Sequence, residues 1–409
     1  MAARITLTAL SDQSLVASEV SSQRIIEWVV EAAEQPKAAA RAPLNIALVI
    51  DRSGSMHGEK LHYVQQAACH VLDLLGPGDR AAIIAYDDTI TTIAPSTLVT
   101  PSAKQAMQRD ILQLRPGGST NLSGGWLEGC RLIAEQLQAE NITRALLLTD
   151  GLANAGIVDV EELSVHAREL RKRGVATSTF GVGLDFNEQL LELLAEQGGG
   201  HFYFIERPQQ IPEVFRSELG ELLTITAREA TLSIGAPRGV AVEIMGGLPH
   251  ERSAERLRVF LGDMCAGERR MIYTRVTTPT DTVGTSVVIG GELSYADLSG
   301  KHQHLATSVA FSYQADAIVQ QVGVREDLLA RAAEVELAAA AREALRLERE
   351  GQREQAQAVM QASLAAAPAM PAPAAAAYQD LASQLGQGME ESERKQAHFS
   401  AYKKRQSRS

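Results

Sequence analysis

The stretch between residues 43 and 225 alternates short, continuous apolar runs with segments of helical periodicity. An apolar run of about four to eight residues is typical of a strand that is covered on both faces, and alternation with helices favours a parallel sheet. We therefore predict a doubly wound α/β domain over 43–225. Its predicted strands are 44–51, 80–86, 89–94, 144–149, 176–182 and 201–205. Its predicted helices are 58–75, 102–113, 122–139, 159–173, 187–197 and 209–223.

Asp87 and Asp88 alone separate the strands predicted at 80–86 and 89–94. So short a connection is typical of a hairpin, because parallel strands need a longer crossover. We therefore expect one antiparallel edge strand on an otherwise parallel sheet. Either carboxylate could bind an ion, but we expect both residues to be solvated parts of the turn.

Oxygen-bearing side chains gather where predicted strands end and helices begin. Asp51, Ser53 and Ser55 follow the first apolar run and precede the first helix. Because Asp and Ser are also ordinary turn and capping residues, these three alone do not define a site. Thr120 precedes a later helix, and Asp150 directly follows another buried strand. Carboxyl ends of strands in open α/β sheets are where ligands bind, and hard divalent cations prefer oxygen ligands, so we interpret this set as a metal site.

The spacing of these five residues resembles the metal-ion-dependent adhesion site of von Willebrand factor type A domains. All five positions are filled: Asp51, Ser53 and Ser55 in one motif, then Thr120, then Asp150. The resemblance implies that the first three side chains hold a divalent ion directly or through water. It also implies that Thr120 is a ligand whose role changes with ligand state and that Asp150 acts through water.

The resemblance implies recognition of another protein. The ion would keep an open position, and the carboxylate of a partner's Asp or Glu would complete its coordination. Mg²⁺ suits so compact an oxygen site, with Ca²⁺ or Mn²⁺ as alternatives. We expect a metal-dependent adaptor or scaffold of a bacterial cytosolic type, and an ATPase of the AAA+ class is one partner that the resemblance suggests.

Two other functions remain as alternatives at this point. A metal-dependent hydrolase would need a base near the ion, and His57 is the candidate by position. We expect His57 to be an exposed residue at the helix start and the chain not to be an enzyme. An exported surface adhesin is the other alternative. The first residues show no charged segment followed by an apolar core, so we expect a cytoplasmic protein.

Charge and composition exclude other classes of function. The formal net charge is -11, whereas nucleic-acid binding is driven by clustered Lys and Arg. No apolar run approaches the roughly 18 residues that a membrane-spanning helix needs. The three cysteines show no metal-binding spacing and fit a reducing compartment. We therefore expect neither a nucleic-acid partner nor a membrane span.

Strand-like patterns flank the α/β domain on both sides. Residues 1–35 and 226–315 contain short alternating runs separated by turn residues, which favours a β-sandwich. We predict that the two segments form one sandwich into which the α/β domain is inserted. Gly290 and Gly291 are expected to form a turn between two short strands of this sandwich.

The C-terminal region is predicted to be helical and then basic. Residues 325–390 are rich in helix formers, with Gly351 between the two helices of a hairpin, an Ala/Pro-rich linker at 365–377 and a further helix. The last segment, 391–409, carries clustered Lys and Arg. It is either a docking peptide or a mobile tail, and we expect the mobile tail.

Overall fold

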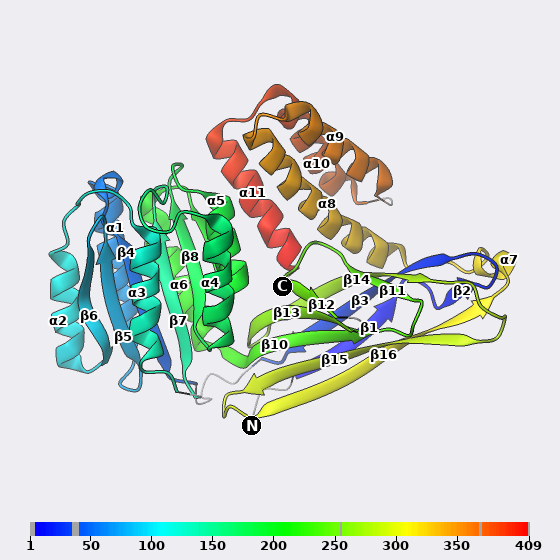
Figure 1. The fold of residues 1–409 in the computed structure, drawn as a ribbon, viewed down its shortest axis with the longest axis horizontal. Coiled ribbons are helices and arrows are strands. Elements are labelled where there is room, and N and C mark those ends of the chain that lie inside the picture. Colours follow the sequence, from blue (N-terminus) through cyan, green and yellow to red (C-terminus); the bar gives the residue numbers. More distant parts are fainter. Residues whose placement is uncertain (1–4, 35–40, 139, 254–255, 368–369, 408–409) are drawn as a thin grey trace. The chain divides into compact units, whose positions relative to one another are not determined.

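The computed structural model describes residues 5–34, 41–138, 140–253, 256–367 and 370–407. The chain divides into two compact units, and each is described by itself here (Figure 1). One unit comprises Pro36–Arg228 with Leu298–Lys301. The other comprises Met1–Gln35, Glu229–Asp297 and His302–Ser409. Residues 36–43, which begin and end with proline, are predicted from the sequence to form a linker, and most of them lie outside the described residues.

The first unit is an α/β fold around a six-stranded sheet in the order β6-β5-β4-β7-β8-β9 (Figure 1). All neighbouring strands are parallel except the β5–β6 pair, so the predicted antiparallel edge strand and the predicted fold class are confirmed. The strands are β4 (Leu44–Asp51), β5 (Arg80–Tyr86), β6 (Ile90–Leu98), β7 (Ile142–Thr149), β8 (Ala176–Val182) and β9 (Gly199–Ile205). The helices are α1 (Glu59–Leu74), α2 (Pro101–Leu112), α3 (Leu122–Ala134), α4 (Val160–Lys172), α5 (Glu188–Gly198) and α6 (Ile211–Leu223).

The central strands explain why this sheet forms. Every residue of β4 and of β7 is buried, which requires cover on both faces of the sheet. A parallel sheet is stable only when helices supply that cover, and the amphipathic helices between the strands provide it. Because β4 and β7 are adjacent and parallel, their carboxyl ends meet at one edge of the sheet.

The second unit contains two sheets, in the orders β1-β3-β14-β11 and β12-β13-β10-β15-β16-β2. β3 pairs with β14 along ten residues, and β2 pairs with β16, so the N-terminal strands share both sheets with strands from the later part of the chain. The α/β unit thus enters the chain between strands of this β-rich unit. The strands are β1 (Ile5–Ser11), β2 (Leu15–Ala17), β3 (Ser22–Ala32), β10 (Ile225–Gly235), β11 (Ala241–Ile244), β12 (His250–Arg252), β13 (Arg256–Cys265), β14 (Arg269–Thr278), β15 (Ser286–Asp297) and β16 (His302–Gln314).

The turn predicted at Gly290 and Gly291 is wrong, because β15 runs through both residues. Gly291 instead faces Trp28 of β3. A Cβ atom at Gly291 would lie 2.3 Å from Cζ3 of Trp28, so a side chain there would collide with the indole. The glycine leaves room for a large core residue of the other sheet and does not end the strand.

The described part of the C-terminal region of this unit consists of helices joined by short connecting segments (Figure 1). Within the described residues, none of the helices has both the length and the apolar character that crossing a bilayer requires. The Ala/Pro-rich segment is shorter than predicted because Pro373 lies in the first turn of a helix, where a missing N–H is harmless. The helices are α7 (Asp316–Val319), α8 (Glu326–Arg349), α9 (Arg353–Ala366), α10 (Ala372–Gln387) and α11 (Glu391–Gln406).

The prediction of a mobile basic tail at 391–409 is wrong for most of that segment, because α11 forms there and packs against α8. Glu390 and Glu393 form a capping box that starts the helix. Several of its polar residues are buried, and Arg405 donates through Nε to the carbonyl of Gly246 at 3.1 Å. The charges that suggested solvation therefore belong in part to the packed face of a helix.

Candidate metal centre

The structure brings the predicted metal ligands together at the carboxyl edge of the α/β sheet. Asp51 is the last residue of β4, and Asp150 directly follows β7. Ser53 and Ser55 lie in the turn and short 3-10 helix η1 (Gly54–Met56) that connect β4 to α1. Asp51 and Asp150 are fully buried, whereas Ser55 is exposed. The site therefore has carboxylates at its base and a hydroxyl at its surface.

Short polar contacts connect four of the five residues. The backbone N–H of Ser53 donates to Oδ1 of Asp51 at 2.8 Å. The hydroxyl oxygens of Ser53 and Ser55 are 3.2 Å apart, and the Ser55 hydroxyl donates to Oδ1 of Asp150 at 2.6 Å. These side chains already present their oxygens to one small volume, as a cation site requires.

Thr120 reaches the same volume from the loop before α3. A Cβ atom at Gly151 would lie 3.6 Å from the Ser55 hydroxyl oxygen and 3.7 Å from the Thr120 hydroxyl oxygen, so both hydroxyls approach the same point. The backbone N–H of Thr120 donates to Oδ1 of Asn154 at 2.8 Å, which fixes the loop beside the end of β7. All five predicted side chains thus converge.

Asp87 is not the solvated turn residue that we predicted, because it is buried and holds the loop that carries Thr120. It accepts hydrogen bonds from the backbone N–H groups of Thr89 at 2.7 Å and Gly118 at 3.3 Å, and it pairs with Arg52. Burial alone would raise the pKa of Asp87, but these donors outweigh it and lower the pKa. Asp88 remains exposed, as predicted.

The Asp51 carboxylate lies in an environment that favours a bound cation. Burial raises the pKa of Asp51 to about 6, and the nearby charge of Asp150 adds to the rise. Hydrogen bonds from Ser53 and Thr149 oppose the rise, the Thr149 hydroxyl donating to Oδ2 at 2.7 Å. Two buried carboxylates at one point repel each other, and a divalent ion between them would remove that repulsion.

Lys60 is a neighbour that the sequence did not reveal. Its ammonium lies 2.5 Å from Oδ2 of Asp150. A lysine in the first turn of a helix opposes the helix dipole, and this unfavourable position was the signal for a carboxylate close by. Thr149 and Asp87 also were not among the predicted site residues, because their roles depend on a strand end and a hairpin meeting in space.

The donor set decides which chemistry the site can support. Carboxylate and hydroxyl oxygens suit Mg²⁺, Ca²⁺ or Mn²⁺ and offer no soft ligand. The five residues therefore fit a hard divalent cation, which would supply positive charge for binding an anionic group. His57, the candidate base of the hydrolase alternative, is exposed in the turn before α1, as expected.

Comparison with known proteins identifies the class of this α/β unit. The family of von Willebrand factor type A domains matches residues 45–217. This match shows that residues 45–217, which make up most of the α/β unit, form a von Willebrand factor type A domain. The resemblance noted in the sequence is therefore confirmed at the level of the family.

Both units of the chain have counterparts in solved structures. A von Willebrand factor type A protein from Catenulispora acidiphila superposes with a TM-score of 0.77 at 16% identity, covering 98% of this chain and 96% of that one. The ArnB paralog VWA2 from Sulfolobus acidocaldarius gives a TM-score of 0.63 at 18% identity, covering 98% and 99%. At such identities the likeness concerns the fold.

Similarity in sequence extends to proteins of very different length. The protein sll0103 of Synechocystis sp. is 29% identical over 344 residues, which is 80% of each chain. YfbK of Escherichia coli is 29% identical over 216 residues, which is 52% of this chain but 37% of YfbK. Human inter-alpha-trypsin inhibitor heavy chain H4 matches over 40% of this chain and 18% of its own length.

Proposed function

We propose that this chain is a metal-dependent binding protein that holds an Asp or Glu carboxylate of a partner protein through a divalent cation. The cation would be held by Asp51, Ser53 and Ser55, with Thr120 and Asp150 completing its surroundings. Domains of this family commonly mediate protein–protein interaction, in some cases through a metal. The role is recognition, not catalysis.

One observation carries this proposal, namely the burial gradient across the site. The carboxylates of Asp51 and Asp150 are inaccessible, while Ser55 at their surface is exposed. The two carboxylates would neutralise a cation from the buried side of the site only. Its remaining coordination position would therefore face solvent. An anionic oxygen is the natural ligand for that position.

The engagement of the hydroxyls argues for recognition over hydrolysis. The Ser55 hydroxyl already donates to Asp150, and its oxygen lies 3.2 Å from that of Ser53. A cation bound there would take the lone pairs of these hydroxyl oxygens, so both serines would act as ligands of the ion and not as free nucleophiles. We propose Mg²⁺ as the ion, with Ca²⁺ and Mn²⁺ as alternatives that the same oxygens accept.

We propose that the chain acts in the cytoplasm as an adaptor or scaffold, with an AAA+ ATPase as a candidate partner. In such a role, the α/β unit would hold one protein through its cation, and the β-rich unit would offer further surface.

Calorimetric titration of Mg²⁺ into the EDTA-treated full chain tests the cation. We expect one binding site, with affinity reduced more than about tenfold in Asp51→Ala, because the variant loses a direct charged ligand. Asp110→Ala is the matched control, since Asp110 is a partly exposed carboxylate on α2 whose ion-pair partner is its neighbour Arg109. Equal affinities in the two variants would overturn the cation assignment.

Capture from a native extract tests the partner. A partner that binds through the cation is retained by the full chain in Mg²⁺, released by EDTA, and not retained by Asp51→Ala. Re-addition of Mg²⁺ after dialysis should restore its binding to the unmodified chain. A partner retained equally by Asp51→Ala and in EDTA would contradict cation-mediated recognition.

A further inference from the structure

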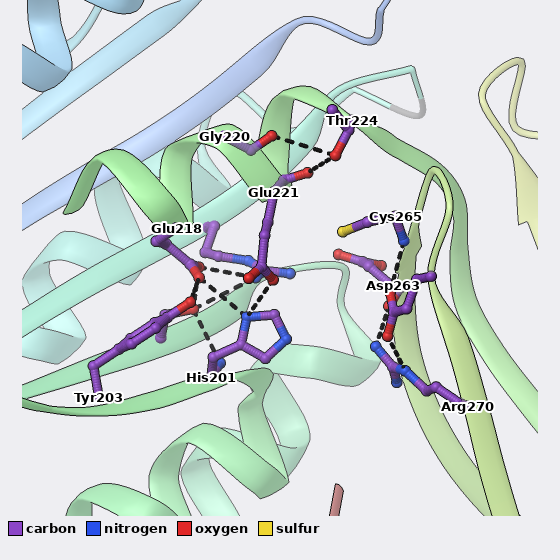
Figure 2. Close-up of polar contacts among 12 residues, drawn as sticks. His201, Tyr203, Glu218, Gly220, Glu221, Thr224, Asp263, Cys265 and Arg270 are labelled. Atoms are coloured by element: carbon purple, nitrogen blue, oxygen red, sulfur yellow. Dashed lines mark hydrogen bonds and ion pairs between the residues drawn. The ribbon is translucent and has the colours of Figure 1, made fainter. Parts of the chain in front are cut away.

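A second group of metal-binding side chains lies in the α/β unit, formed by one histidine and two glutamates (Figure 2). His201 is on β9, and Glu218 and Glu221 are on α6. One ligand atom from each residue lies within 4.8 Å of the other two. Nδ1 of His201 is 3.0 Å from Oε2 of Glu218 and 3.5 Å from Oε2 of Glu221.

The local structure explains why these three side chains meet. Glu218 and Glu221 are three residues apart on a helix and so lie on the same face. The chain turns at Gly199, which has a left-handed conformation with φ of 70°, directly from α5 into β9. This turn places His201 at the start of the strand, where it faces both glutamates (Figure 2).

The Glu218 carboxylate is fixed in position by neighbours. It is fully buried, and its Oε1 accepts from Arg144 at 3.1 Å and from the Ser178 hydroxyl at 2.5 Å. Its Oε2 accepts from the Tyr203 hydroxyl at 2.7 Å and faces His201. Partners of this kind orient metal-ligating carboxylates and are a usual feature of protein metal sites.

This group is separate from the site at Asp51. Arg144, Ser178 and His201 each stand third in β7, β8 and β9, so the group lies near the amino ends of these parallel strands. Asp150 follows the carboxyl end of β7. Asp150 is six positions beyond Arg144, which corresponds to about 20 Å of extended chain.

We propose that Nδ1 of His201, Oε2 of Glu218 and Oε2 of Glu221 form a zinc site. Bonds from Zn²⁺ to histidine nitrogen and carboxylate oxygen are about 2.0–2.2 Å, which places ligand atoms of a tetrahedral ion about 3.3 Å apart. The separations of 3.0 and 3.5 Å fall on either side of that value. An imidazole ligand favours Zn²⁺ over Mg²⁺ and Ca²⁺. Water would occupy the fourth position.

Competition for Zn²⁺ between the full chain and a chromophoric chelator tests this assignment. The chain is first stripped with EDTA, and Mg²⁺ is then added in excess to fill the site at Asp51. We expect one equivalent of Zn²⁺ to bind, and more than about tenfold weaker binding in His201→Ala and in Glu221→Gln. Asp51→Ala should bind Zn²⁺ as the unmodified chain does, because that residue belongs to the other site.

His304→Ala is the matched control. His304 is exposed and pairs with Glu292 at 3.2 Å, so it offers the same residue types without the arrangement of three ligands. Its Zn²⁺ affinity should be unchanged. Because Glu221 is partly exposed, Glu221→Gln keeps the test valid if His201→Ala fails to fold. Unchanged affinity in Glu221→Gln, or loss of Zn²⁺ binding only in Asp51→Ala, would overturn the proposal.

Discussion

At the scale of single residues, Lys60 places a positive charge beside the candidate cation site in its metal-free state. Its ammonium, about one-quarter exposed, lies 2.5 Å from the fully buried Asp150 carboxylate. Lys60→Ala removes a charged partner from that carboxylate, so we expect the EDTA-treated variant to be less stable by about 1–3 kcal/mol. The same change removes a positive charge that repels the cation, so Mg²⁺ affinity should increase.

Chemical denaturation in EDTA and in Mg²⁺ measures both effects. Lys172→Ala is a suitable control, because Lys172 forms an exposed pair with Glu169 on α4 and such pairs contribute little. Weaker Mg²⁺ binding by Lys60→Ala would show instead that Lys60 orients Asp150 for the ion.

Glu218 makes the stability of the α/β unit depend on pH. Burial disfavours its ionised form, but His201, Arg144 and Ser178 outweigh burial and hold the pKa of Glu218 well below its usual range. A carboxyl with a lowered pKa in the folded state stabilises that state above its unfolded pKa of about 4.3, and this stabilisation is lost as the pH falls toward the folded value.

Glu218→Gln should therefore be less stable than the unmodified chain by about 3–5 kcal/mol at pH 7, because it breaks the buried ion pair between Glu218 and Arg144. The difference should shrink as the pH falls below about 4. Urea denaturation between pH 3 and pH 7, in EDTA to exclude bound metal, measures it. Glu169→Gln, at an exposed pair, is the control. A difference that stays constant down to pH 3 would show that the carboxylate charge is not the cause.

At the scale of elements, apolar periodicity was sufficient to predict the strands and helices of the α/β unit, where the two kinds of element alternate. The predicted strands 44–51, 80–86 and 176–182 coincide with β4, β5 and β8, because buried strands have continuous apolar runs with clear ends. The convergence of the five residues proposed as the metal site could also be predicted, because each lies close to the end of a strand or the start of a helix. Their supporting contacts were not predicted, since Asp87, Thr149 and Lys60 meet the site only through the fold.

Local patterns failed where a residue's role depends on a distant partner. The two glycines of β15 indicate a turn unless the position of Trp28 is known. The basic segment at the C-terminus indicates solvation unless the packing of α11 against α8 is known. In both cases the deciding contact joins segments that are far apart in the sequence.

Substitution of the two glycines of β15 separates strand propensity from packing. Gly291→Ala would place a Cβ atom 2.3 Å from the Trp28 ring, so we expect a loss of about 1–3 kcal/mol in the free energy of unfolding. Gly290→Ala is its control, because a Cβ atom there has no other atom within 4 Å. Urea denaturation should show Gly290→Ala to be at least as stable as the unmodified chain. Equal losses in both variants would contradict the packing explanation.

At the scale of the whole molecule, the chain contains two compact units that do not follow each other in sequence. The strands β3 and β2 precede the α/β unit, yet they pair with β14 and β16 respectively, which follow it. The α/β unit has its own buried strands, and the β-rich unit has its own apolar residues around Trp28. Each unit therefore has the core that cooperative unfolding requires.

Two cores in one chain predict two thermal transitions, and Mg²⁺ should raise the midpoint temperature of only one of them. The proposed cation ligands all belong to the α/β unit, and a ligand stabilises the unit that binds it by about 2.7 kcal/mol at one hundred times its dissociation constant. Differential scanning calorimetry of the full chain with EDTA or Mg²⁺ measures this shift. In Asp51→Ala the shift should disappear while the other transition keeps its midpoint. A single transition that moves as a whole with Mg²⁺ would show that the two units unfold together.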